Sequence, residues 1–160
     1  MSQSRPLADR LEIAAPEIAA LLARAAGRLP APVRSAVLQS AFDRARDAFN
    51  RGDMEAVFAL FATDVEYGPP APLCEGGRAQ TIHGRGAVFE FWRMVRERFD
   101  VNTIENLSLE EATPGRFVRR ARLRHRSSAS GEQLEYVIVQ TTELQHGRVA
   151  RQVNVLERDA

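Results

Sequence analysis

The stretch AFNRGDMEAVFALFATDVEYGPP, residues 48–70, carries the signals that decide the fold. Gly52 can end one helix, and Asp53 can cap the next by accepting backbone N–H bonds. The short apolar segment 54–61 is predicted to be that second helix, and 65–67 a short strand that enters a proline-rich loop. Two helices followed by a strand predict a domain that mixes helices with a sheet.

Helical periodicity continues on both sides of this stretch. Apolar residues recur at helical spacing over 33–50 and again over 87–99. In the first of these segments Arg44 and Arg46 lie off the apolar stripe. Together with 54–61, these segments predict three helices in the main domain.

The beginning of the chain has a helical pattern of its own. Apolar residues form a partial stripe over 7–28, within which Pro16 can begin a second helical piece. The segment GRLPAP, 27–32, breaks the pattern because glycine can cap a helix and proline stops one. We therefore predict an N-terminal helical extension over 1–32 and a main domain over 33–160.

After Asp100 the apolar periodicity changes from 3.6 to 2, which is typical of strands. Turn sequences separate four candidate strands at 103–111, 116–126, 133–144 and 147–157. Helices first and antiparallel strands second predict an α+β fold, in which a curved antiparallel sheet wraps on the three helices.

Composition narrows the classes of function. The formal net charge of +1 over 160 residues does not favour nucleic acid or an anionic membrane as a partner. All 22 basic residues are arginine, which excludes Schiff-base chemistry on lysine. Cys74 is the single cysteine, so no internal disulfide is possible, and three histidines without ligand spacing predict no metal site. With no signal-peptide pattern and no apolar run of membrane-spanning length, we expect a cytoplasmic protein.

Three segments of the chain resemble a known family. They are 48–70, IHGRGAVFEFW at 82–92, and HGRVARQVNVLER at 146–158. The order of elements resembles the cone-shaped fold of nuclear transport factor 2. Among proteins of this fold, the chain is similar to the SnoaL-like branch of polyketide cyclases and limonene epoxide hydrolases. The resemblance implies an apolar pocket between sheet and helices, a few polar groups at its base, no cofactor, and a homodimer.

The resemblance also implies a position for the catalytic base. Enzymes of this branch commonly place an aspartate on the last strand, a few residues after a glycine turn, and here that position holds Asn154. Asparagine can bind a carbonyl or an enolate, but it cannot take a proton as a carboxylate does. A base must then lie elsewhere, and His125 and His83 are the first candidates, because imidazole titrates near pH ~6.5. The alternative is that His125 is a strand-end residue without a role and His83 a loop residue at the pocket mouth.

Strand parity selects the residues that face the pocket. If Asn154 faces inward, so do Gln152 and Leu156, whereas Val149 faces the other way. On 116–126 one face is apolar apart from Arg119 and His125, and the other carries Arg120, Arg122, Arg124 and Arg126. We expect the arginine row to face solvent or a dimer partner.

Site residues follow from these arguments. The expected catalytic or polarising residues are Tyr67, His83, His125, Gln140 and Asn154. The expected substrate-binding residues are Phe61, Trp92, Phe117, Leu123, Tyr136, Ile138 and Gln152. For Tyr67 simple packing is the slightly favoured interpretation, and Trp92 is interpreted as part of the core or of the apolar pocket wall.

Two functions remain open from the sequence. One is a cofactor-independent enzyme that cyclises, isomerises or dehydrates a small, largely apolar carbonyl or hydroxyl compound by proton transfer in a hydrophobic pocket. The other is a non-catalytic ligand-binding or dimerisation module, which the missing last-strand carboxylate favours. Epoxide hydrolysis of the limonene type is disfavoured, because it needs inward carboxylates that 116–126 and 147–157 lack.

Overall fold

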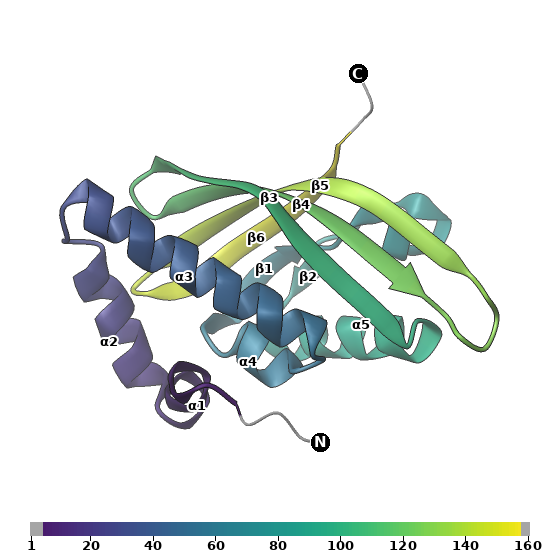
Figure 1. Ribbon diagram of the computed structural model, residues 1–160, viewed down its shortest axis with the longest axis horizontal. Coiled ribbons are helices and arrows are strands. Elements are labelled where there is room, and N and C mark those ends of the chain that lie inside the picture. The colour runs from purple at the N-terminus through teal and green to yellow at the C-terminus, as the bar shows by residue number, and fades with distance from the viewer. Residues whose placement is uncertain (1–4, 158–160) are drawn as a thin grey trace.

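The computed structural model describes residues 5–157, which form a six-stranded sheet with helices packed on one face (Figure 1). In chain order the elements are α1 (Leu7–Ala14), α2 (Pro16–Ala26), α3 (Ala31–Asn50), α4 (Met54–Phe58), β1 (Phe61–Gly68), η1 (Ala71–Leu73), η2 (Glu75–Gly77), β2 (Ile82–His83), α5 (Arg85–Arg98), β3 (Val101–Thr113), β4 (Arg116–Arg126), β5 (Gln133–Gln145) and β6 (Arg148–Leu156). No helix in this described part of the chain is long and apolar enough to cross a membrane.

The sheet has the strand order β2-β1-β6-β5-β4-β3. Its neighbours are antiparallel except for β1 and β6, which run parallel. The predicted α+β class and the four predicted C-terminal strands are confirmed, but the sheet is mixed rather than purely antiparallel. Strand β1 is also longer than expected: it begins at Phe61, which the helical pattern had assigned to the preceding helix.

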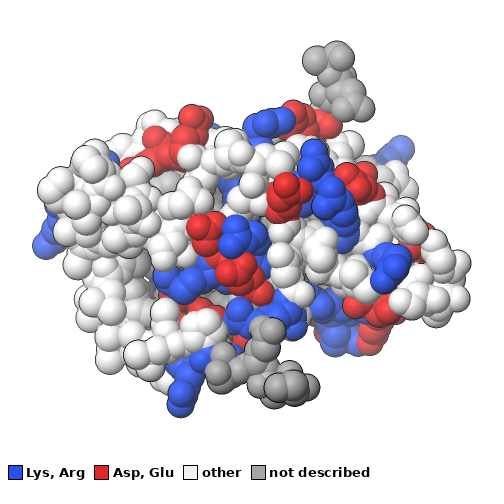
Figure 2. All heavy atoms as spheres, in the orientation of Figure 1, with Lys and Arg blue, Asp and Glu red and all other residues white. Residues whose placement is uncertain are grey.

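The core lies between the concave face of the sheet and helices α3, α4 and α5. Phe49, Phe58 and Trp92 meet Leu123 and Ile138 there, and all five side chains are buried. The opposite face of β4 carries the arginine row, and three of its members pair with glutamates: Arg120 with Glu157, Arg122 with Glu105, and Arg124 with Glu135. Figure 2 shows the same mixing of signs on the face that α3 presents.

Helices α1 and α2 lie against α3, α4 and the turn between β5 and β6 (Figure 1). The ion pairs that hold them are Arg44 with Glu12, Arg51 with Asp9, and Arg148 with Glu17. At the turn, the α carbon of Gly147 lies so close to α2 that a β carbon built there would be 2.1 Å from the carbonyl oxygen of Ala20. The extension is therefore packed on the sheet domain through a contact that needs a glycine.

Replacing Gly147 with alanine is expected to displace α2. Gly131 is a matched control, because its φ of +74° is close to the +76° of Gly147, yet a β carbon there would meet nothing within 4 Å. Both changes force alanine into left-handed backbone, which costs about 1 kcal/mol. Gly147→Ala should lose more unfolding free energy in a denaturant titration, and it should expose 16–30 to protease. Equal losses and equal cleavage in the two variants would contradict this contact.

Candidate functional site

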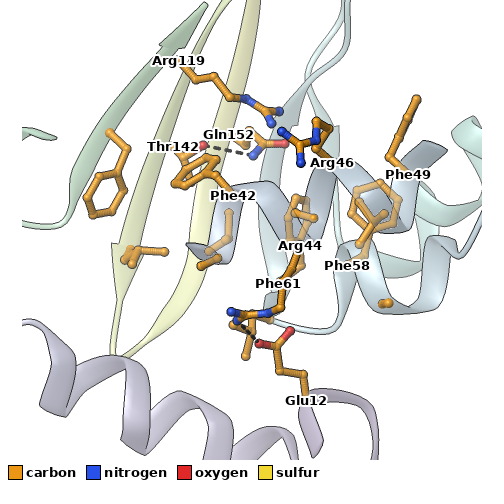
Figure 3. A pocket seen from close by; sticks show the side chains of 18 of the residues that line it. Glu12, Phe42, Arg44, Arg46, Phe49, Phe58, Phe61, Arg119, Thr142 and Gln152 are labelled. Carbon is orange, nitrogen blue, oxygen red and sulfur yellow. Dashed lines mark hydrogen bonds and ion pairs between the residues drawn. The ribbon is translucent and has the colours of Figure 1, made fainter. Parts of the chain in front are cut away.

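A cavity of about 380 Å³ lies between the concave face of the sheet and helices α1 to α4. Its volume is in the range of small-molecule sites. Aromatic and aliphatic side chains form most of its wall, among them Phe117 and the four phenylalanines labelled in Figure 3, Phe42, Phe49, Phe58 and Phe61. Helices α1 and α2 supply part of this wall, so the N-terminal extension contributes to the site.

Two rows of side chains cross strands β4, β5 and β6 on the cavity side. In the first row Arg119 pairs with Gln140, and Gln140 with Asn154; in the second, Phe117 pairs with Thr142, and Thr142 with Gln152. Alternation along each strand points all six side chains to the concave face, and the register places them side by side. All six line the cavity, and five of them are polar.

Asn154 faces the cavity, but both atoms of its amide are engaged. Its Oδ1 accepts a hydrogen bond from Nε2 of Gln140 at 2.8 Å, and its Nδ2 donates to the carbonyl oxygen of Gly68 at 2.8 Å. Asn154 therefore ties β6 to both of its neighbours. In the same rows Gln152 donates to Oγ1 of Thr142 at 3.0 Å. The buried Oε1 of Gln140 has no partner within residues 5–157.

Tyr67, which pairs with Gln152 in the register of β1 and β6, contacts Trp92. The tyrosine hydroxyl accepts a hydrogen bond from Nε1 of Trp92 at 3.1 Å and lies beside Asn154. Burial raises the pKa of Tyr67, so its hydroxyl stays protonated and can act as a donor, not as a base.

His125 lies in the core, outside the cavity lining. Its Nδ1–H donates to Oδ1 of Asn102 at 2.6 Å, and its Nε2 accepts from the hydroxyl of Tyr136 at 2.9 Å. Asn102 in turn donates to the carbonyl oxygen of Phe99 at 2.6 Å. Burial lowers the pKa of His125 to about 4, so the ring is neutral at physiological pH. This closed chain of bonds supports the packing interpretation of His125 and not a role as a base for a ligand.

The structure therefore brings together some of the expected site residues and not others. The nine that line the cavity are Phe61, Tyr67, Trp92, Phe117, Leu123, Ile138, Gln140, Gln152 and Asn154. Tyr136 is buried beside His125, and neither residue lines the cavity. His83 is exposed on the edge strand β2, so we give it no role.

The predicted alternation of inward and outward side chains on β6 is wrong near the start of the strand. Val149 was expected to face away, yet it is buried and lines the cavity. The reason is an irregularity in the pairing of β5 and β6: Glu143 pairs with Arg151 and Leu144 with Val149, which leaves Ala150 as an extra residue. At the other end Leu156, expected inward, is 39% exposed.

Arg119 is a cavity residue for which the sequence predicted no role. The residue is only 7% exposed. Its Nη1 donates to Oδ1 of Asn106 at 3.0 Å, and its guanidinium lies 5.4 Å from the ring centre of Phe42. Its Nε has no partner within residues 5–157. Burial, together with Arg46, lowers the pKa of Arg119 to about 10, so the side chain is still a cation at neutral pH. The signal was present in the sequence, since Arg119 has inward parity on a strand with no acidic residue.

Carboxylates reach the cavity from helix α1. Glu12 lines it at the end away from Arg119 (Figure 3), and Asp9 is also a lining residue. Glu12 accepts a hydrogen bond from Nη2 of Arg44 at 3.1 Å, yet burial raises its pKa. Asp9 is tied to Arg51. Sequence patterns gave no sign of this, because α1 lies far from the sheet in the chain.

Within residues 5–157 no three His, Cys, Asp or Glu side chains lie together in a way that could hold a metal ion. Cys74 lies in the loop after β1, where its Sγ contacts the carbonyl oxygen of Pro70 at 3.4 Å. Burial raises the pKa of this thiol, which disfavours the thiolate. The polar chemistry of the cavity therefore comes from amides, hydroxyls, arginines and the carboxylates of α1.

Comparison with solved structures shows the same fold in several proteins. An NTF2-like protein of unknown function from Burkholderia pseudomallei has 22% identity and a TM-score of 0.63, over 74% of this chain and 89% of its own. TerC, crystallised with polyporic acid, has 19% identity and a TM-score of 0.62, over 74% and 89%. IdmH, a candidate polyketide cyclase from Streptomyces antibioticus, has 18% identity and a TM-score of 0.59, over 74% and 91%. At these identities the likeness concerns the fold alone.

A family model for the SnoaL-like domain matches residues 42–152. None of the curated proteins matches the chain. The matched range begins within α3 and ends within β6, so it contains all of α4, α5 and β1 to β5, parts of α3 and β6, and most of the cavity wall. By this match and by its NTF2-like fold, the chain belongs to the SnoaL-like family.

Proposed function

We propose that this protein is a cofactor-independent enzyme that acts on a small, largely apolar carbonyl or hydroxyl compound held in the cavity. The observation that carries the proposal is the division of the cavity: an apolar body, amide and hydroxyl groups from the sheet at one end, and Glu12 at the other. Cyclisation, isomerisation and dehydration all need a polarised oxygen and a proton acceptor, and this arrangement offers both.

The sheet end suits binding of a polarised oxygen. Gln140, Asn154 and Tyr67 are fixed by hydrogen bonds to their neighbours, so they would not need to reorganise around a ligand. Where related enzymes have a last-strand aspartate, the neutral amides of Gln140 and Asn154 would bind the oxygen atom of the ligand. Such amides stabilise an enolate by donating hydrogen bonds, and they take no proton.

Glu12 is the proton acceptor in this proposal. It lines the cavity, and its raised pKa lies closer to neutrality than that of a solvated carboxylate, which improves a base. His125 is unsuitable because both ring nitrogens are engaged in the core.

A non-catalytic ligand-binding module is the second candidate. One observation favours it: Glu12 is already paired with Arg44, which stabilises the carboxylate and weakens it as a base. A binding module would keep the cavity and show no turnover.

Proton exchange at the α carbon of a ketone separates the two candidates without knowledge of the natural substrate. We expect the protein to accelerate deuterium incorporation into 2-tetralone in D₂O, followed by NMR, because the ketone is apolar and readily forms an enol. Glu12→Gln should reduce the acceleration at least about 100-fold, the usual contribution of a general base. Glu17→Gln is the control, since Glu17 lies on α2 with an exposed side chain. Binding of 2-tetralone without any acceleration would favour the binding module.

Assembly and location remain expectations. The family resemblance predicts a homodimer, and exposed apolar side chains on the first helices, such as Ile18, Leu21 and Leu22, offer a surface for self-association. The cytoplasm is the expected location from the sequence.

A further inference from the structure

A buried cation without a carboxylate partner needs an explanation. Arg119 is almost fully buried, and none of the ion pairs within residues 5–157 includes it. Taking a charge out of water is unfavourable unless an opposite charge and hydrogen bonds compensate it. Asn106 satisfies one guanidinium nitrogen and Phe42 offers its ring, but the Nε–H group stays unsatisfied.

A second guanidinium faces the same part of the cavity. Figure 3 shows Arg46, from α3, and Arg119, from β4, pointing toward each other beside Gln152. Two like charges in this position repel, and the proximity of Arg46 contributes to the lowered pKa of Arg119. An anion between them would turn this repulsion into two attractions.

The acidic residues nearby are already used by Arg46. Asp43 accepts from Nη1 of Arg46 at 3.0 Å, and Asp47 accepts from its Nε at 2.9 Å. Asp43 also accepts a longer bond, 3.4 Å, from Nδ2 of Asn106. Neither Asp43 nor Asp47 is among the residues that line the cavity, so the carboxylates that pair with Arg46 lie outside its lining.

A hydrogen-bond acceptor without a partner lies next to Arg119, on the neighbouring strand β5. Gln140 pairs with Arg119 in the register of β4 and β5, and its buried Oε1 has no partner within residues 5–157. The same cavity end therefore presents an unused donor, an unused acceptor and the cation of Arg119 without a carboxylate partner, and Phe42 and Phe117 line the cavity there.

We propose that the ligand of this cavity is a largely apolar carboxylic acid whose carboxylate binds between Arg119 and Arg46. A carboxylate matches the planar guanidinium with two parallel hydrogen bonds, and it supplies the missing negative charge. A hydroxyl group on the same ligand would donate to Oε1 of Gln140. This inference rests on the proposed function, because it assumes that the cavity holds a small molecule, and it names the chemical class of that molecule.

Calorimetric titration with a matched pair of probes tests the inference. The probes are 2-naphthoate and 2-naphthamide at neutral pH, which share ring and shape and differ in charge. We expect the wild-type protein to bind 2-naphthoate about tenfold more tightly, since charged hydrogen bonds are stronger than neutral ones. Arg119→Met should remove that preference while 2-naphthamide still binds. Arg120→Met is the control, because Arg120 lies next in sequence on the outer face of β4, paired with Glu157.

Each outcome bears on one of the two proposals. Equal affinity for both probes in the wild-type protein would overturn the carboxylate inference and leave the small-molecule cavity standing. A preference that persists in Arg119→Met would also overturn it. Failure of both naphthyl probes and of 2-tetralone to bind would contradict the proposed function itself. The wild-type comparison needs no variant, so it decides even if Arg119→Met does not fold.

Discussion

Between about pH 6.5 and pH 4 the wild-type protein is expected to lose about 3 kcal/mol of unfolding free energy that a His125→Gln protein does not lose. The pKa of His125 is lowered from 6.5 to about 4 in the folded protein. In this window the unfolded chain binds a proton at His125 and the folded chain does not. Acid therefore favours unfolding: the contribution is complete above pH 6.5 and lost as the pH falls to the folded-state value.

The cause is the closed chain of bonds around the ring. A protonated ring carries two N–H donors, but Nε2 of His125 accepts from Tyr136, so the added proton would face another donor. The side chain is 2% exposed, which leaves the charge without water. The glutamine of the variant does not have to reproduce both bonds for the argument to hold, because any neutral side chain removes the titration.

Denaturant titrations at several pH values give the measurement. The difference in unfolding free energy between wild type and His125→Gln removes the contribution of the carboxylates, which titrate in both proteins. At neutral pH the variant should be less stable by about 2 kcal/mol, because buried partners lose their bonds. Exposed His83→Gln is the control and should follow the wild-type curve. Parallel curves for wild type and His125→Gln would show that the ring is not held neutral.

The same variant separates a core histidine from a catalytic one. His125 does not line the cavity, so folded His125→Gln should still exchange the α protons of 2-tetralone at neutral pH. Parity alone could place His125 on the inner face, and it did so correctly. It could not show that His125 lies outside the cavity lining, beside Trp92, which does line it, since depth in a core depends on packing between elements distant in the chain.

Local patterns predicted strands well where nothing interrupted them. On β4 the alternation from Phe117 to His125 holds without exception, because β4 is paired with β5 in continuous register. On β6 the same reasoning placed Asn154 correctly and Val149 wrongly, because the extra residue Ala150 reverses the parity. A one-residue bulge leaves no mark in the alternation of side chains over so short a strand.

The cavity residues that the sequence analysis missed are brought to the site by contacts between segments distant in the chain. Arg46 was placed off the apolar stripe of its helix and Glu12 was given no role from the sequence, yet both line the cavity. Helical periodicity reports which face is apolar, but a cavity wall is itself part polar, so its arginines and carboxylates resemble surface residues in the sequence. Arg119 was the exception, since an arginine among inward apolar residues already signalled a buried charge.

Replacing Asn154 with aspartate, the residue common at this position in related enzymes, is expected to cost about 3 kcal/mol of unfolding free energy at neutral pH. The amide Nδ2 donates to the carbonyl oxygen of Gly68 at 2.8 Å, so a carboxylate oxygen would instead face that carbonyl. The side chain is 5% exposed, and desolvation adds to the lost bond, together roughly 4 to 5 kcal/mol. Arg119 attracts the new charge, but two strand spacings away, roughly 10 Å, this recovers only about 1.7 kcal/mol at an effective dielectric constant of about 20.

The pH dependence of this loss has the opposite sign to that of His125. A protonated carboxyl group reproduces the amide, because its O–H donates to the Gly68 carbonyl and its C=O accepts from Gln140. The pKa of the new carboxyl group is therefore raised on folding, and the deficit relative to wild type disappears below the unfolded-state pKa of about 4. The deficit grows as the pH rises from there, and it is complete above the folded-state pKa.

Denaturant titrations of Asn154→Asp against Gln80→Glu measure this deficit, since Gln80 lies in an exposed loop and its replacement adds the same charge. Equal stability of the two variants at neutral pH would mean that a carboxylate is tolerated at position 154, and that Asn154 is not required to keep this position neutral.

The expected loss of stability has a consequence for ligand binding. If the deficit appears, a second negative charge at this end is unfavourable both for folding and for 2-naphthoate, whose affinity should fall in Asn154→Asp while that of 2-naphthamide changes less. The neutral side chain of Asn154 then does not compete with the carboxylate of the ligand for the positive charge of Arg119.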